Sequence, residues 1–502
     1  MRLLSALIAI TARGALSAIS GEEQVPLTDT TNPDHVDTPL NVAIIGAGAA
    51  GSSSAYHLAQ FAREAGLPIN ITIFDRNPYI GGRATTVNVH DDPAQPVELG
   101  ASIFVQANQI LLNATRDFNL STTEDDDDDD SPIPGAALAI WDGQSLLYQQ
   151  TTGKTSWWEN AKLIWKYGLL NPLRTLNLKR STIAAFLRLY TSPVFPFDSL
   201  TDAAEQIGLL PAATNEGKEE ASSEVDDDDD DDAESGFTSR QPQRQRQHQH
   251  QENFDTVILA APYQSLNLTL TPSSLLTHTP SPIPYVSLHV TLFTTPHLLS
   301  PTFFNLSPDQ PAPKTILTTL PADEAPGQGS SSAGSVGFFS ISLIRSLRNP
   351  GTGEREYLYK IFSPERVSRG FLARILGVGQ RGQSGGEKVE GVGEGEGAGV
   401  DIETENDDDD NDDMNPEQII TWLHRKLWHS YPYETPRDGF EPIRLDHGGR
   451  GGNKEGGGEG GRGIWYTGGM ESFISTMETN ALMGRNVARL VVDEWVTGMR
   501  ER

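Results

Sequence analysis

The sequence contains no cysteine, so no disulfide can link its parts, and cysteine usage says nothing about the redox compartment. Basic residues are also scarce: 38 lysines and arginines stand against 68 acidic residues, giving a formal net charge of -30. An acidic surface repels phosphate, which argues against nucleic acid as a partner. No stretch is long and apolar enough for a membrane helix, so we expect no transmembrane segment. The 502 residues allow two domains with ample cores.

Three acidic runs explain most of the net charge. They lie at 124–130, 226–232 and 407–413, and they hold seven, seven and six acidic residues. Runs of one sign repel themselves and stay solvated, so we predict solvated loops and favour this over calcium or protein binding. We predict an acidic loop at 121–136, a disordered acidic and Gln-rich insert at 211–252, a low-complexity insert at 366–415 and a Gly-rich loop at 448–463. His248 and His250 lie in the second of these, and we predict no metal site there.

The N-terminus has the pattern of a secretory signal peptide over residues 1–20. Arg2 precedes a short apolar stretch, and Ala18-Ile19-Ser20 is typical of a cleavage site. N-x-[ST] sequons occur at five positions, of which the one at Asn70 falls in a predicted strand: Asn70, Asn113, Asn119, Asn267 and Asn305. We therefore expect a glycoprotein of the secretory pathway, either vacuolar or lysosomal or secreted.

The stretch from Asn41 to Gly51, NVAIIGAGAAG, predicts a dinucleotide-binding turn. An apolar strand leads into glycines 46, 48 and 51 in G-x-G-x-x-G spacing, and a helical pattern follows. In such a turn the glycines allow the bend, the approach of a diphosphate and close helix packing, while the helix N-terminus attracts the anion. The predicted contact residues are Gly46, Gly48, Ala49, Ala50 and Gly51. Asp75, at the end of a second strand (69–74), is placed to accept hydrogen bonds from ribose hydroxyls.

The residues after Asp75 select among dinucleotides. Arg76 and the turn Gly81-Gly82-Arg83 resemble flavoproteins of the amine-oxidase-like superfamily, in which the arginine and glycine backbone help hold the FAD phosphates. The segment Glu98-Leu99-Gly100-Ala101-Ser102 is similar to the turn that lies beside the flavin in that superfamily. The whole block from 75 to 115, the block at 157–168 and the C-terminal segment 467–490 resemble the prenylcysteine oxidase (prenylcysteine lyase) family.

This resemblance implies an α/β fold, with a Rossmann-type FAD-binding domain beginning at 39–120 and a second α+β substrate domain. It implies FAD as cofactor, held by Gly82, Arg83, Gly100, Ala101 and Ser102 and by Gly469, Met470 and Glu471 near the C-terminus. The implied reaction oxidises the thioether of a farnesyl- or geranylgeranyl-cysteine, a lipophilic small molecule, with oxygen as acceptor. The implied products are cysteine, a prenyl aldehyde and hydrogen peroxide. The flavin supplies the chemistry, and no catalytic acid or base is assigned.

Two alternatives stay open: another FAD oxidase of the amine-oxidase type, and an inactive secreted relative. The interval 208–253 suggests the inactive relative. Family members carry a block there that contacts adenine, whereas this chain is acidic and Gln-rich. The absence of cysteine also excludes a flavin attached through a cysteine thioether.

Further elements follow from periodicity. We predict a helical substrate region over 137–210, in which 157–190 forms either an ordinary core or the lining of a long apolar pocket. A returning strand and the substrate-domain sheet occupy 253–365, with strands near 254–259, 285–294 and 356–363. A helix capped by Asn415 and a loop occupy 416–447, and a strand followed by a long helix from Met470 closes the FAD site over 464–498.

Overall fold

The computed structural model describes residues 39–100, 103–120, 135–150, 170–209, 252–266, 268–271, 273–321, 324, 329–378, 419–433, 439–446 and 463–500. The predicted signal peptide, the three acidic runs, Asn267, His248 and His250 lie outside the described residues. Most of the predicted inserts and the block 157–168 also lie outside them. What was predicted for these segments stays a prediction.

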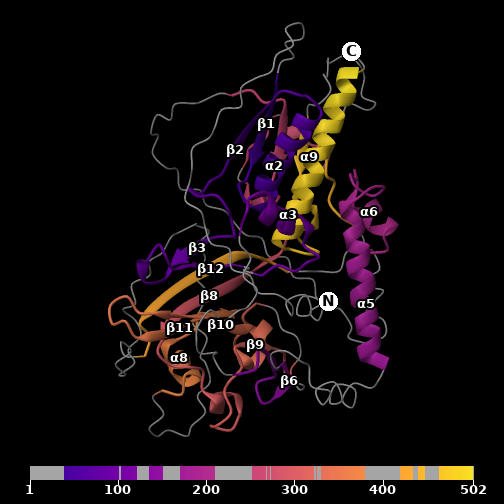
Figure 1. Ribbon diagram of the computed structural model, residues 1–502. Helices are drawn as coiled ribbons and strands as arrows, with labels where there is room; N and C mark the ends of the chain where they lie inside the picture. The colour runs from indigo at the N-terminus through magenta and orange to yellow at the C-terminus, as the bar shows by residue number, and fades with distance from the viewer. Residues whose placement is uncertain are drawn as a thin grey trace, which may run out of the picture.

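A parallel four-stranded sheet forms the first layer, in the order β13-β7-β1-β2. Its strands are β1 (Leu40–Ile45), β2 (Ile69–Phe74), β7 (Thr256–Leu259) and β13 (Gly463–Tyr466). Strands from both ends of the chain therefore belong to one sheet, with β1 and β13 on either side of β7. Figure 1 shows β1 and β2 of this sheet in its upper half. The α/β class is confirmed, and the carboxyl ends of these parallel strands face one edge of the sheet, where ligands bind in such folds.

Two long helices, α2 (Ala49–Glu64) and α9 (Met477–Arg500), pack against each other beside this sheet (Figure 1). Small residues allow the close approach. The Ser53 hydroxyl donates to Ala481 O at 2.6 Å, and a side chain at Gly484 would overlap the carbonyl oxygen of Ala50. Leu58, Val487 and Val491 are fully buried in the same core, so the two chain ends share one hydrophobic interior.

The second layer is a seven-stranded, mostly antiparallel sheet in the order β12-β8-β11-β10-β9-β5-β6. Its strands are β5 (Leu138–Trp141), β6 (Leu146–Gln150), β8 (Tyr285–Thr295), β9 (Thr315–Thr318), β10 (Ser340–Arg348), β11 (Arg355–Ser363) and β12 (Trp422–Pro432). Alternate residues along β11 lie in two different clusters. Leu358 packs towards the short hairpin β3 (Thr86–Asn88) and β4 (Pro96–Glu98), whereas Tyr359 packs towards α8 (Arg369–Ile375) on the opposite face.

Three further helices contribute to the core of the parallel sheet: α3 (Gln109–Asp117), the C-terminal end of α5 (Leu170–Leu187) and α6 (Leu200–Gln206). Glu478, on α9, accepts hydrogen bonds from the backbone N–H groups of Ile110 and Leu111 at 2.8 and 3.0 Å, so it caps α3 from another helix. Its carboxylate also accepts a hydrogen bond from the Tyr190 hydroxyl at 2.7 Å. None of the helices in the described part of the chain is long and apolar enough to cross a membrane.

Several predictions of elements are wrong. The segment 422–432, predicted as part of a helix, is strand β12. Its apolar residues at three- and four-residue spacing mimic a helix, but pairing with β8 places Trp422 and Trp428 on one face of the sheet. The predicted helical region 137–210 begins with strands β5 and β6, and the predicted insert at 366–415 begins with helix α8, whose Leu372 and Ile375 are buried. In each case long-range burial decides the structure.

The long C-terminal helix begins at Met477 and not at Met470. Gly468–Met470 forms a separate 3-10 turn. Thr476 and Thr479 set the start of the helix, because the N–H of each donates to the hydroxyl of the other, at 3.0 and 3.1 Å. This reciprocal arrangement resembles a capping box.

Candidate dinucleotide site

The glycine loop joins β1 to α2 at the carboxyl edge of the parallel sheet. Gly46 has a φ of 110°, and a side chain there would lie 2.9 Å from Ala260 O, so both conformation and space require glycine. A side chain at Gly51 would overlap the carbonyl oxygen of Gly46. Beside Gly48 there is room: the nearest atom to a side chain there is Gly81 O, at 3.9 Å.

The start of α2 is left open for an anion. Its N-cap residue, Gly48, offers no side chain to the first turn, and that turn holds no acidic residue. Ala49 and Ala50 begin the helix, and neither side chain can accept its free N–H groups. Uncapped N–H groups and the helix dipole both favour a phosphate at this place.

Asp75 holds the loop from the neighbouring strand. One carboxylate oxygen accepts a hydrogen bond from Ala47 N at 2.7 Å, and the other accepts one from Asn77 N at 2.7 Å. Each oxygen has a second lone pair, and the side chain lies at the surface together with Arg76. The carboxylate therefore fixes the loop and still has acceptor capacity for ribose hydroxyls.

The turn at 81–83 closes on the glycine loop. Gly81 N donates to Ala47 O at 3.0 Å, and a side chain at Gly82 would lie 3.3 Å from the Cα of Gly48. The φ angles of 127° and 62° at Gly81 and Gly82 favour glycine at both positions. Two segments that lie about thirty residues apart in the sequence thus meet at one point.

Arg83 reaches the C-terminal segment. Its guanidinium donates to Glu471 at 2.6 Å and to the Ser475 hydroxyl at 3.1 Å. Glu471 is only 3% exposed and also accepts hydrogen bonds from Asn480, at 3.0 Å, and from the Tyr285 hydroxyl, at 3.4 Å. The pKa of the Tyr285 hydroxyl is raised above its usual range, mainly by burial and to a lesser extent by the negative charge of Glu471. Arg83 and Glu471, predicted from distant segments, are therefore direct partners.

Gly469 and Met470 lie in the buried turn between β13 and α9. Thr467 N donates to Leu259 O at 3.1 Å, which ties this turn to the carboxyl end of β7. A side chain at Gly469 would lie 3.2 Å from Glu441 O. Residues 467–471 therefore lie at the same edge of the parallel sheet as the glycine loop.

Gly100 is fixed by Glu98, whose carboxylate accepts hydrogen bonds from Thr85 N at 3.0 Å and from Gly100 N at 2.8 Å. A side chain at Gly100 would lie 2.5 Å from Arg83 O, so this turn packs against the turn at 81–83. Burial raises the pKa of the Glu98 carboxyl. Ala101 and Ser102 lie outside the described residues, and their predicted role stays a prediction.

Sequence reasoning missed Lys360, a buried lysine on β11 whose amine donates to Glu98 O at 3.1 Å and to Gly100 O at 2.9 Å. The available signal was a single lysine within the apolar strand EYLYKIFS. It also missed Tyr285, Ser475 and Asn480 as partners of the Arg83–Glu471 pair. No group of three metal-ligating side chains occurs among the residues that the structure describes.

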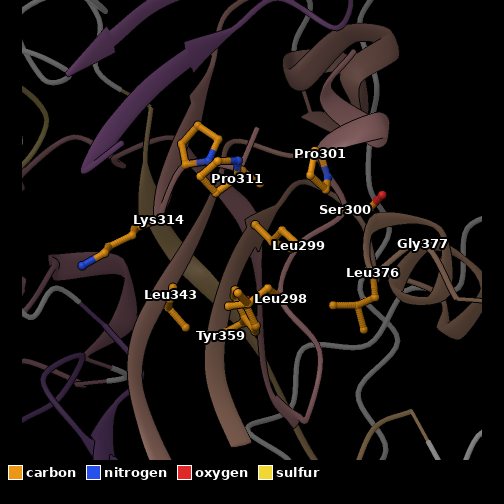
Figure 2. Close-up of a pocket in the computed structure, with 12 residues that line it drawn as sticks. Leu298, Leu299, Ser300, Pro301, Pro311, Lys314, Leu343, Tyr359, Leu376 and Gly377 are labelled. Atoms are coloured by element: carbon orange, nitrogen blue, oxygen red, sulfur yellow. The ribbon is translucent and has the colours of Figure 1, made fainter. Parts of the chain in front are cut away.

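A cavity of about 340 Å³ lies elsewhere (Figure 2). Leu298, Leu299, Leu343, Tyr359 and Leu376 line much of it. Tyr359 and Leu343 belong to the cluster on the α8 face of the seven-stranded sheet, opposite to the face that carries Leu358. This cavity is therefore separate from the glycine loop.

Comparison with known proteins assigns the family. The family model for prenylcysteine lyase matches residues 150–227 and 229–501, and the model for an NAD(P)-binding Rossmann-like domain matches residues 44–116. The chain belongs to the prenylcysteine lyase family. This confirms the family predicted from the sequence, and its first matched domain is the Rossmann-like unit built from β1, α2 and β2.

Individual relatives match more narrowly. Farnesylcysteine lyase of Arabidopsis thaliana is 31% identical over 182 residues, covering 33% of this chain and 35% of the relative. Prenylcysteine oxidase 1 of Bos taurus is 29% identical over 174 residues, covering 34% and 30%. Aplysianin-A of Aplysia kurodai is 27% identical over 139 residues, covering 27% and 23%. The chain thus spans about a third or less of the length of these relatives, with coverages of 35%, 30% and 23%.

Proposed function

We propose that this protein is an FAD-dependent oxidase of S-prenyl-L-cysteine. In the overall reaction the thioether substrate, water and oxygen become cysteine, a prenyl aldehyde and hydrogen peroxide. The observation that carries the proposal is the convergence of the glycine loop, the turn at 81–83 and Glu471 at one edge of the sheet, in a chain of the prenylcysteine lyase family. The names of the relatives from Arabidopsis thaliana and Bos taurus support the substrate class.

The residues present suit a dinucleotide with a diphosphate. The uncapped start of α2 and the backbone of Gly46 to Gly51 would hold the diphosphate, and Asp75 would accept from the adenosine ribose. Gly82, Arg83, Gly100 and the segment 469–471 would line the remainder of the cofactor. FAD is preferred to a nicotinamide because the turn Gly81-Gly82-Arg83 resembles that of flavoproteins.

When bound, FAD would supply the redox chemistry by accepting hydride from the carbon next to sulfur and passing the electrons to oxygen. The chain's own residues bind, orient and exclude water. Arg83 and Glu471 fix the two polypeptide segments that would enclose the cofactor. Neither residue is assigned a proton-transfer role.

We propose that the prenyl chain lies beside Phe339, Phe362 and Trp428, at the rim of the apolar cluster on the face of the seven-stranded sheet that meets the turn at 98–100. These three aromatic side chains are partly buried, whereas Leu292 and Leu358 at the centre of the cluster are fully buried against the hairpin. Such walls suit a long apolar substrate. The sequence also offered the stretch 157–190 as a lining. Its residues 157–169 lie outside the described residues, and Phe186 and Leu187 in its described part pack against the core of the parallel sheet.

The test is peroxide and free-thiol release from purified protein supplied with S-farnesyl-L-cysteine, with a panel of primary and secondary amines in parallel. We expect cysteine and peroxide in equal amounts from the thioether and none from the amines. Turnover of amines alone would replace the proposal with an amine oxidase. The matched control is Gly51→Val, which blocks the glycine loop sterically.

A second candidate, a relative without turnover, is favoured by one observation. Within the described sheet β2 is an edge strand, and its Ile73 and Phe74 are 41% and 40% exposed. The family resemblance implies a further block beside this part of the fold. The corresponding interval of this chain, 208–253, does not match that block. Protein that takes up no FAD and releases no thiol would support this candidate. Sequencing of the transcript across the interval would decide whether a coding block was lost.

We further propose that the protein enters the secretory pathway and resides in the vacuole or lysosome, or is secreted. The support is the signal-like sequence at 1–20 and the exposed sequons at Asn113, Asn119 and Asn305. Treatment of the expressed protein with an N-glycosidase should increase its gel mobility, and the variant Asn113→Gln should show a smaller shift. Full-length, unglycosylated cytosolic protein would contradict this proposal.

A further inference from the structure

Lys360 occupies an unusual place for a lysine. It lies on β11, near the centre of the seven-stranded sheet, and it is only 6% exposed. Leu292 and Ser342, its paired neighbours on β8 and β10, carry no charge. The amine also lies 5.3 Å from the centre of the Phe362 ring. A charged amine is costly in such surroundings, so stability alone favours an apolar residue at this position.

The amine has one defined task in the fold. It donates to the carbonyl oxygens of Glu98 and Gly100, at 3.1 and 2.9 Å, and thereby ties the seven-stranded sheet to the turn that follows β4. On its other side this turn is held by the Glu98 carboxylate, which accepts from Thr85 N and Gly100 N. The turn is thus fixed between the sheet and the segment that carries Arg83.

The amine of Lys360 can also change its protonation state near neutral pH. Burial lowers the pKa of Lys360 to about 8, and the negative charge of Glu98 opposes this change. Glu98 faces the amine from the hairpin. The other charged or ionisable groups between the sheet and the hairpin are Arg345, which donates to Pro96 O at 3.0 Å, and the pair of His90 with Glu356, at 3.0 Å. Loss of one proton leaves two donors, which still match the two carbonyl oxygens. The turn can therefore stay in place while the local charge changes near neutral pH.

We propose that Lys360 is a positioning residue for the dinucleotide site: its amine fixes the turn at 98–100, and its ionisation gives that site a pH response. This rests on the proposed function only for the identity of the cofactor, FAD. Lys360 acts through the backbone of Glu98 and Gly100, which precedes the residues predicted to lie beside the flavin. No contact of Lys360 with substrate is required.

The first test needs no cofactor. Lys360→Met keeps the length of the side chain and removes its donors, and Lys426→Met is the matched control. Lys426 lies on β12 of the same sheet, and its amine lies 5.0 Å from the centre of the Trp428 ring and forms no hydrogen bond with the turn at 98–100. In apoprotein at pH 7, amide hydrogen exchange over 97–100 should speed up in Lys360→Met and stay unchanged in Lys426→Met. Unchanged exchange in both would overturn the positioning role.

The second test follows stability against pH. The pKa of Lys360 in the fold, about 8, lies below the ordinary value of 10.5, so the unfolded chain binds more protons between these values. The free energy of unfolding of the wild-type protein should therefore rise relative to Lys360→Met as pH increases from 8 to 10.5. A constant difference would show that the amine does not titrate in this range and would overturn the pH response.

The third test uses the FAD-loaded protein. The flavin absorbance should titrate with a midpoint near pH 8. This titration should vanish in Lys360→Met and also in Lys360→Arg, which keeps the positive charge. It should remain in Lys426→Met. We expect FAD to bind about tenfold more weakly to Lys360→Met, the worth of a lost hydrogen bond from a charged donor. Normal FAD binding and an unchanged titration in Lys360→Met would reject the inference and leave the proposed oxidase intact. Wild-type protein that binds no FAD would reject the proposed function, and the exchange and stability tests would still decide the role of Lys360.

Discussion

The parallel sheet and the seven-stranded sheet are held together by different means. In the parallel sheet, glycines and small residues permit close backbone approach: Gly51 packs on Gly46, and Gly484 packs on Ala50. In the seven-stranded sheet, large apolar side chains fill both faces, and a few buried polar groups mark where the two parts meet. The parallel sheet therefore depends on positions that have no side chain, and the seven-stranded sheet depends on positions where large side chains are buried.

This difference explains which substitutions each part tolerates. In the glycine loop the backbone segments are in direct contact, so an added methyl group would overlap backbone atoms. A face built on packed side chains can rearrange, and volume-conserving changes there cost less. The contacts between the two parts, Arg83 with Glu471 and Lys360 with the turn at 98–100, combine charge with burial. They are expected to show intermediate effects.

The largest effect is expected for Gly51→Val. The new side chain would overlap the carbonyl oxygen of Gly46, so the loop must open, at a cost of about 3 kcal/mol in the free energy of unfolding. FAD binding should be lost. Urea denaturation and flavin titration measure the two effects.

The control is Gly66→Ala, where nothing lies within 4 Å and only the positive φ of 70° opposes a side chain. That variant should lose about 1 kcal/mol and keep FAD binding. Equal losses in the two variants would contradict the steric account of the loop.

An intermediate effect is expected for Glu471→Gln. It removes the charge that Arg83, Asn480 and Tyr285 share, although the Arg83 side chain is 40% exposed and water weakens the pair. A loss of about 1–2 kcal/mol is expected, well below that for a fully buried pair. Thermal unfolding measures it.

Asp493→Asn is the comparison, because it breaks the partly exposed pair with Arg489 on α9. It should cost less than about 0.5 kcal/mol. A larger loss in Asp493→Asn than in Glu471→Gln would show that the Arg83–Glu471 contact does not join the two segments.

The smallest effect is expected for Ile73→Lys on the edge strand β2. The side chain is 41% exposed, so the free energy of unfolding should change by less than about 0.5 kcal/mol. A lysine on an open edge also discourages strand pairing between molecules, which light scattering at high protein concentration would detect. A loss greater than about 1.5 kcal/mol would show that Ile73 is buried in solution and that β2 is not an edge.

The sequence predicted the parallel sheet well because its signals are local. Strand 69–74 was predicted with the observed bounds, and the spacing of glycines 46, 48 and 51 identified the loop. The pair Arg83–Glu471 joined two segments that only family resemblance had linked. Such positions can be predicted because glycines at this spacing after a strand, and a buried acidic residue, are uncommon without a structural or functional role.

The remainder depended on pairing between distant segments. Residues 422–432 follow a helical spacing by their leucines, yet pairing with β8 makes them a strand. The start of α9 was misplaced because the Gly468-Gly469 turn suggested it, although Thr476 and Thr479 carry a local capping signal. Lys360 could not be assigned, since its partners are backbone carbonyls some 260 residues away.

The most direct test of the account is the cofactor content and thiol release of the purified full-length protein. The dinucleotide released by heat would be identified by chromatography, and S-farnesyl-L-cysteine would then be added to intact protein without oxygen. We expect one FAD per chain, and we expect the thioether to bleach it with release of an equimolar amount of cysteine. A colourless protein that takes up no FAD, or bound FAD that the thioether does not reduce, would contradict it.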